Sequence, residues 1–276
     1  MRIHREHEAI NPPLDRGDRW FYAALAVLGG VYVALVAALL WADAAYTSPG
    51  HLWASLQSPE IRHAIRLSLL SCSITAILSL WAAIPLAYLM ARTSFPGKRA
   101  LDALLDVPII LPPLVIGLSL LILFQTRGGR WVEQVLPVTY HVPSIILAQF
   151  TVACALAVRM LRTTFEQLSP RQEHVALTLG CNRAQAFWRI VLPSARRGIL
   201  AAGTMAWARS LGEFGPILIF SGATRMKTEV LPTTVFLELS VGNLEAAVAV
   251  SLLMIFAAVL VLIFVRFAIT PAGRSH

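Results

Sequence analysis

Two ionisable residues of opposite charge lie inside an otherwise apolar stretch of the chain. Arg209 and Glu213 fall in the run from about 199 to 220 and are four residues apart, which is about one helical turn. A charge at bilayer depth is costly and normally faces protein or water. Gly212 and Gly215 flank Glu213 and permit a helix break or a close backbone approach. These residues form either an ion pair that holds the fold or a pore or gate element, and Arg209 could also bind an anion.

Two adjacent prolines also have two possible roles, one structural and one functional. Pro112 and Pro113 lie near the start of the apolar run from about 107 to 124, which also contains Pro108 and Gly117. Proline removes a helical hydrogen bond, and the freed carbonyl groups must be satisfied by protein or by a water-filled cavity. The pair therefore predicts a kinked or irregular helix start, whose role is either kink geometry or pore lining.

The motifs of common enzyme sites are missing from this sequence. It has no G-x-x-x-x-G-K-[ST] phosphate loop, no H-E-x-x-H zinc motif and no G-x-S-x-G nucleophile elbow. Its three cysteines show no metal-ligand spacing, and we assign His4 and His7 to a solvated tail. We therefore expect no catalytic residues, no metal, no cofactor and no ATP hydrolysis by this chain.

The elements that must position these residues are membrane spans. Of the 276 residues, 57% are hydrophobic and 14% are charged, whereas soluble domains average about 45–50% apolar and about 25% charged. We therefore expect an all-α integral membrane protein. Six apolar runs have roughly spanning length: 20–41, 67–90, 107–124, 143–158, 199–220 and 244–267. The first is too long for a signal peptide, whose apolar region has about 7–15 residues, so we interpret it as a retained span.

The distribution of charge orients these spans. If the N-terminus is cytoplasmic, 16 of the 23 lysines and arginines lie in cytoplasmic segments and 6 lie in outer loops. The outer loops are neutral overall once their acidic residues are counted. The positive-inside rule then places both termini in the cytoplasm. The net charge of +8 therefore reports orientation and does not require a nucleic-acid partner.

The segment 159–198, between the fourth and fifth runs, is long for a connector and should carry its own structure. We expect two short helices. The first begins after Ser169, in a capping-box pattern with Pro170 and Gln172, and stops at Gly180. The second is capped by Asn182, and Pro193 either ends it or opens the next helix.

This segment is amphipathic. Apolar residues recur at largely helical spacing, namely Val175, Leu179, Ala186, Phe187 and Ile190. The polar face carries Arg171, Arg183, Arg189, Arg196 and Arg197. The pattern fits a hairpin lying on the anionic inner leaflet, or a docking element for a cytoplasmic partner.

The same residues resemble the EAA loop of ABC-importer permeases. The pattern reads Glu173-x-x-Ala176-x-x-x-Gly180, followed by nine residues and Ile190-x-Leu192-Pro193, and it departs from the family at His174 and Val175. In that family the loop forms the coupling helix that docks into the ATPase. The resemblance assigns this role to Glu173, Ala176 and Gly180, with their neighbours Thr178, Leu179, Cys181 and Asn182.

The resemblance extends from about 61 to 267. The stretches 110–117 and 207–215 are similar to those of molybdate, tungstate and sulfate permeases. It implies a type I ABC importer permease domain over 61–267, preceded by a tail (1–19) and a first span (20–41) and followed by a tail (268–276). It also implies a prokaryotic inner-membrane protein with six spans.

The implied function is the pathway for molybdate or tungstate, or else sulfate, delivered by an extracytoplasmic binding protein. The implied partners are two cytoplasmic ATPase subunits, that binding protein and a second permease copy. Another cargo, such as thiamine, ferric iron or phosphate, is the alternative, followed by an ATPase-independent transporter or channel.

Overall fold

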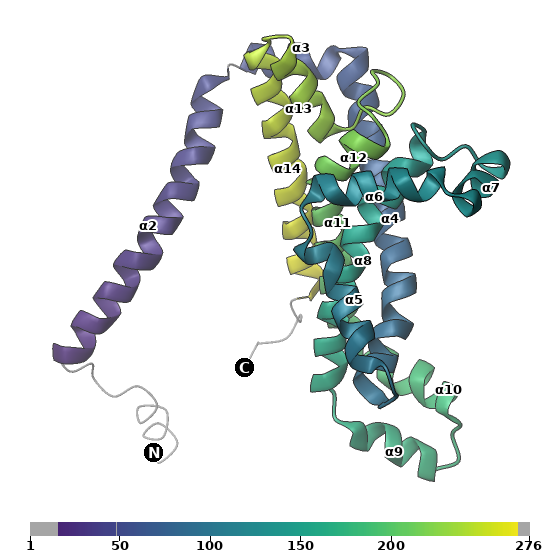
Figure 1. The fold of residues 1–276 in the computed structure, drawn as a ribbon. Coiled ribbons are helices and arrows are strands. Elements are labelled where there is room, and N and C mark those ends of the chain that lie inside the picture. The colour runs from purple at the N-terminus through teal and green to yellow at the C-terminus, as the bar shows by residue number, and fades with distance from the viewer. Residues whose placement is uncertain (1–15, 48, 270–276) are drawn as a thin grey trace. The chain divides into compact units, whose positions relative to one another are not determined.

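A computed structural model of the chain describes residues 16–47 and 49–269. The chain divides into two compact units, Met1–Ser48 and Pro49–His276. The described part of the first unit holds α2 (Arg16–Tyr46). The second unit holds α3 (Pro49–Gln57), α4 (Pro59–Arg92), α5 (Lys98–Ile110), α6 (Pro113–Gln125), α7 (Arg127–Val135), α8 (Val142–Gln167), α9 (Pro170–Thr178), α10 (Arg183–Ala186), the π-helix η1 (Phe187–Val191), α11 (Leu192–Leu211), α12 (Gly215–Phe220), α13 (Leu231–Ser240) and α14 (Leu244–Ile269) (Figure 1). Every regular element in these ranges is a helix, which confirms the all-α class.

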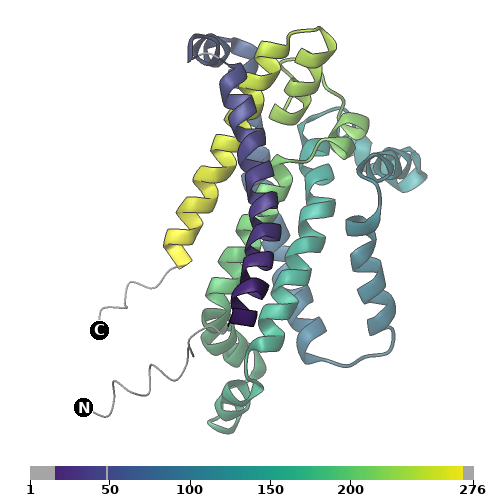
Figure 2. The ribbon, with the colours of Figure 1, turned by 90° about the vertical axis from the view of Figure 1, so that its left-hand side faces the viewer.

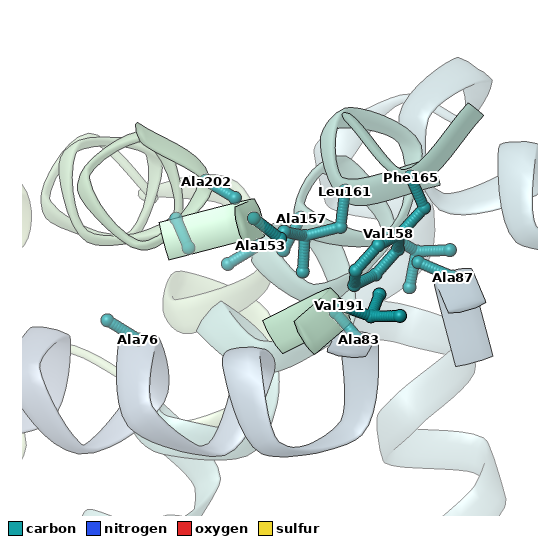
Figure 3. Packing of buried hydrophobic residues seen from close by; sticks show 12 residues of the cluster. Ala76, Ala83, Ala87, Ala153, Ala157, Val158, Leu161, Phe165, Val191 and Ala202 are labelled. Atoms are coloured by element: carbon teal, nitrogen blue, oxygen red, sulfur yellow. The ribbon is translucent and has the colours of Figure 1, made fainter. Parts of the chain in front are cut away.

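The centre of the second unit is built from α4, α8 and α11, which pack against one another. Figure 3 shows that their contact surfaces consist largely of small side chains, including Ala83, Ala87, Ala153, Ala157 and Ala202. Between membrane helices the hydrophobic effect supplies little attraction, so small residues stabilise the pair by allowing close backbone packing. Larger side chains such as Leu161 and Phe165 fill the same cluster farther along α8.

Among residues 16–47 and 49–269, four helices are long and apolar enough to cross a membrane. They cover Arg19–Tyr46, Pro59–Arg92, Val142–Gln167 and Leu244–Ile263. A fifth crossing results if α5 and α6, which meet at an angle of 112°, count as one broken span. The multi-pass character is therefore confirmed, whereas the count of six spans stays a prediction.

The other two predicted runs are interrupted where their prolines and glycines lie. The run 107–124 is not one helix, because α5 ends at Ile110 and α6 begins at Pro113. Leu111 adopts an extended conformation, as a residue before proline prefers. The run 199–220 is divided between α11 and α12, with Gly212 as the C-terminal cap of α11. The predicted irregularity at both places is confirmed.

The two ends of the second unit carry different elements. Figures 1 and 2 show α9 and α10 beyond one end of the long helices, with α3 and α13 at the other end. The helices α3, α7 and α13 did not stand out in the hydropathy pattern because each has only 9 or 10 residues. The proposed tail residues His4 and His7, and the C-terminal residues from 270 onward, lie outside the described ranges.

Candidate functional site

The first helix of the 159–198 segment is present as α9. The Ser169 side chain accepts a hydrogen bond from the backbone N–H of Arg171 at 3.4 Å, and Pro170 occupies the first turn. This cap satisfies one of the free N–H groups at the helix start. The predicted N-terminus is therefore confirmed, although the described contacts of this cap include no return bond from Gln172.

Gly180 ends α9 in the left-handed conformation that is typical of a glycine at a helix C-terminus. Its φ is +91°, in the left-handed region that side chains disfavour. The N–H of Cys181 donates to the carbonyl of Ala176 at 3.0 Å, and the N–H of Gly180 donates to the carbonyl of Leu177 at 3.1 Å. These two bonds form a Schellman motif, which satisfies the last carbonyl groups of the helix.

The second helix begins at Asn182 as expected but does not end where a short hairpin would. Asn182 and Gln185 form a reciprocal capping box, with bonds of 2.8 and 2.9 Å. The helix then runs through α10 and η1 directly into α11. Pro193 lies in the first turn of α11, so it opens that helix. Ile190 and Leu192 are half-buried on this continuous path, and Pro193 is exposed.

The Glu173 side chain contacts α4. Its carboxylate is buried and accepts a hydrogen bond from the Tyr88 hydroxyl at 2.5 Å. The Nε of Arg92 lies 3.6 Å from the other carboxylate oxygen, and Arg92 also donates to the carbonyl of Leu168 at 2.9 Å. Ala176 is buried on the same side of α9. These contacts attach α9 to the C-terminal end of α4.

The opposite side of α9 is open. Leu179 is 80% exposed and Val175 is 55% exposed, although both are apolar. His174, Thr178 and Gly180 are exposed beside them. Farther along, Cys181 is half-buried and Asn182 is exposed. An exposed apolar tip held by a buried polar attachment is the arrangement expected of a docking element.

Arg209 and Glu213 form an ion pair, which is one of the two alternatives that the sequence left open. The Arg209 Nη1 lies 2.6 Å from the Glu213 Oε2, and the Glu213 side chain is 1% exposed against 33% for Arg209. That oxygen has no partner with hydrogen-bond geometry, so the interaction is mainly electrostatic. The pair neutralises a charge that would otherwise be buried alone.

The structure brings the two interrupted runs into contact. A Cβ on Gly215 would lie 2.8 Å from the Pro113 Cβ, and a Cβ on Gly117 would lie 2.8 Å from the Pro216 Cα. Both distances are too short for real atoms, so glycine is required at each place for α6 and α12 to cross this closely. Pro112 caps the start of α6 beside this crossing. The candidate residues Pro112, Pro113 and Gly215 thus belong to one region, and Gly212 ends α11 three residues before Gly215.

Gln149 is a structural residue that the sequence analysis missed. It is 2% exposed in α8 and donates to the carbonyl of Ser210, near the end of α11, at 3.1 Å. It also accepts a hydrogen bond from the Thr75 hydroxyl of α4 at 3.1 Å. One amide thus joins the three central helices beside the α11 break. An amide inside an apolar run is the sequence signal that could have revealed it.

The opposite end of the unit contains a polar hollow of about 290 Å³ between α3, α4, α13 and α14. Arg225 and Glu238 line it and form an ion pair of 2.8 Å, and Asn243 donates to the second Glu238 oxygen at 2.9 Å. The hydrogen bond to Glu238 raises the pKa of Arg225 further above its ordinary value. Within residues 16–47 and 49–269, no cluster of three or more His, Cys, Asp or Glu side chains could hold a metal ion.

Comparison with known proteins relates this geometry to a family. Residues 83–272 match the family model described as binding-protein-dependent transport system inner membrane component. The molybdenum transport system permease protein ModB of Mycobacterium tuberculosis is 34% identical over 269 residues, which cover 96% of this chain and 99% of that protein. The sulfate transport system permease protein CysT of Escherichia coli is 32% identical over 225 residues, which cover 80% and 81% of the two chains.

A solved structure supports the fold. The chain is similar to one from a bacterial alginate ABC transporter in complex with an alginate pentasaccharide-bound periplasmic protein, with a TM-score of 0.71. The match covers 89% of this chain and 92% of that one, at 16% sequence identity. At this identity the likeness concerns the fold alone, and it agrees with the expected importer permease fold.

Proposed function

Because this chain belongs to the family of binding-protein-dependent transport system inner membrane components, we propose that it forms the membrane pathway of an ATP-driven importer for molybdate or tungstate. The expected family branch is confirmed by its similarity to molybdenum and sulfate permeases. The chain is a multi-pass inner-membrane subunit and not an enzyme, and a separate ATPase performs the hydrolysis. The single observation that carries the cargo proposal is the near full-length match to a molybdenum transport permease, with sulfate as the next candidate.

The proposed topology has six spans with both termini in the cytoplasm. In the described part of the chain four helices have spanning length, the α5–α6 pair would be a fifth crossing, and α11 with α12 would be the sixth. Two observations support the orientation. The seven arginines of 159–198 belong to the segment that contains α9 and α10, and those two helices lie at one end of the second unit.

We assign the coupling role to α9. Its exposed Val175 and Leu179 would contact the ATPase, while Glu173 would transmit the motion through Tyr88 and Arg92 to α4. In this proposal the residues of the EAA pattern have two different roles. Glu173 and Ala176 hold α9 against α4, and their exposed neighbours contact the ATPase. A rigid attachment is needed, since a loosely held helix would absorb the motion.

The crossing of α6 and α12 is the proposed gate region, and the Arg209–Glu213 pair is a structural tie beside it. Because Glu213 already neutralises Arg209, we do not assign cargo binding to this arginine. A tight anion site in a pathway would also slow release. Selectivity in this proposal belongs mainly to the extracytoplasmic binding protein, which would dock at the end that carries the Arg225–Glu238 hollow.

The proposed complex contains two copies of this chain, two ATPase subunits and one binding protein. A homodimer is proposed because the chain contains one permease module, 83–272. The mass of the purified complex tests this directly, and a second, different permease subunit in it would contradict the homodimer.

The experiment for the cargo is reconstitution of the complex in liposomes. ATP hydrolysis is measured with binding protein plus molybdate, tungstate or sulfate, and with thiamine, ferric iron and phosphate as alternatives. We expect molybdate and tungstate to stimulate hydrolysis and to accumulate inside the liposomes. Stimulation by none of the oxyanions would contradict the cargo, and cargo movement without ATP or ATPase would contradict the importer class.

A further inference from the structure

Three arginines surround a hollow at the junction of η1 and α11. The hollow has a volume of about 550 Å³ and is lined by Arg189 from η1, by Arg196 and Arg197 from α11, and by Ile190, Pro193 and Ser194. All three arginine side chains are exposed. In the described part of the chain none of the three makes a hydrogen bond or an ion pair, whereas Arg92, Arg162, Arg209 and Arg225 are each paired with a carboxylate.

Unpaired guanidinium groups gathered in one place repel one another unless an anion lies between them. Guanidinium forks match the geometry of a phosphate group and bind it through paired hydrogen bonds. The hollow therefore has the charge and the donor geometry for a phosphate group.

The surroundings of the hollow are those of a membrane interface. Leu200 lies one turn beyond Arg196 and Arg197 on α11 and is 46% exposed. Trp188 precedes Arg189 in the sequence and is 66% exposed on a neighbouring face of η1, beside His174 and Arg183, and tryptophan favours the headgroup level of a bilayer. A soluble anion needs no apolar neighbours, but a phospholipid needs a surface for its acyl chains directly beyond its phosphate.

We propose that this hollow binds the phosphate of an anionic phospholipid of the inner leaflet, such as phosphatidylglycerol. The inference rests on the proposed function in one respect, which is that the start of α11 lies at the cytoplasmic face of the membrane. The lipid holds the junction through which α9 is connected to α11. The exposed apolar tip of α9, at Val175 and Leu179, is left for the ATPase.

The test is a titration of phosphatidylglycerol into the detergent-solubilised complex, followed by native mass spectrometry. A basic residue near an anionic surface contributes roughly 1 kcal/mol, or about five-fold in affinity. The triple variant Arg189→Gln/Arg196→Gln/Arg197→Gln should therefore bind the lipid about 100-fold more weakly. The matched control removes three exposed positive charges from the other end, as Arg127→Gln/Arg130→Gln/Lys227→Gln, and should bind as the wild type does.

Several outcomes would overturn the proposal. Equal lipid retention by the triple variant and the control would show that the three arginines do not form a lipid site. Displacement of the lipid by millimolar inorganic phosphate or glycerol phosphate would show a site for a soluble anion. Loss of the ATPase subunits from the triple variant with lipid retention unchanged would show a protein contact.

If the triple variant does not fold, the single variant Arg197→Gln should still weaken binding by about five-fold. Wild-type affinity in that variant would equally contradict the site. Because lipid binding is measured without transport, a failed cargo assignment would leave this result unaffected.

Discussion

Replacing Tyr88 by phenylalanine tests whether the attachment of α9 to α4 transmits motion. The substitution removes one hydroxyl group and leaves the ring contacts, because the Tyr88 ring packs against Phe187 at 4.7 Å and against Phe165 at 5.7 Å between ring centroids. The lost interaction is the 2.5 Å hydrogen bond to the buried Glu173 carboxylate. The exposed tip of α9 is not altered.

The size of the effect follows from the burial of Glu173. A hydrogen bond to a charged group contributes about 1.5–3 kcal/mol, and a buried carboxylate that loses it cannot replace it with water at no cost. The remaining partner, Arg92, lies at 3.6 Å, which is too far for a hydrogen bond. The ratio of attached to detached α9 should therefore fall by about 10- to 150-fold.

The assay compares ATP hydrolysis with oxyanion uptake in liposomes that contain the complete importer. With Tyr88→Phe we expect hydrolysis to depend less on the loaded binding protein and uptake per ATP to fall. The ATPase should still co-purify with the permease, because Val175 and Leu179 are unchanged. Tyr140→Phe is the matched control, since the Tyr140 hydroxyl has no hydrogen bond among the described residues.

Two results would refute this reasoning. Wild-type coupling in Tyr88→Phe would show that the attachment does not transmit motion, and an equal defect in Tyr140→Phe would show a nonspecific effect. A double-mutant cycle with Glu173→Gln adds a sharper criterion. If the two effects simply add, the pair does not act as a unit.

Three further predictions test other parts of the structure. Gly180→Val should lower oxyanion-stimulated hydrolysis by about 5- to 30-fold and leave membrane insertion intact, because a left-handed φ of +91° costs a side chain about 1–2 kcal/mol; wild-type stimulation would contradict this. Gly215→Ala should lower thermal stability by about 1–3 kcal/mol, because its Cβ would meet Pro113 at 2.8 Å. Gly212→Ala, whose Cβ would meet nothing closer than 3.9 Å, should be milder, and the reverse order would refute the crossing. Gln149→Leu should lower the melting temperature in detergent, since the Thr75 hydroxyl and the Ser210 carbonyl each lose one of their hydrogen bonds, at about 0.5–1.5 kcal/mol each, and an unchanged value would show that the amide is dispensable.

The parts of this fold that depend on neighbouring residues could be predicted from the sequence. The cap at Ser169, the stop at Gly180 and the capping box at Asn182 all follow from side chains within a few residues of one another. The helix break at Pro112 follows from the backbone restrictions that a proline imposes on itself and on the residue before it. The sequence did not indicate where α5 ends and α6 begins, because apolar side chains continue across the bend between them. A hydropathy pattern does not record the 112° change in direction of the chain at that bend.

The sequence alone established a membrane protein, a basic end and a capped segment between two apolar runs, because composition, charge and caps are local properties. The tertiary structure alone decided which side of α9 faces inward. Glu173 meets Tyr88 across 85 residues of sequence, and Gly215 meets Pro113 across an even longer separation. Contacts of this kind depend on how α4, α8 and α11 pack, and no local pattern encodes that packing. The partners of the buried Glu173 carboxylate were therefore settled only when the helices had been placed in space.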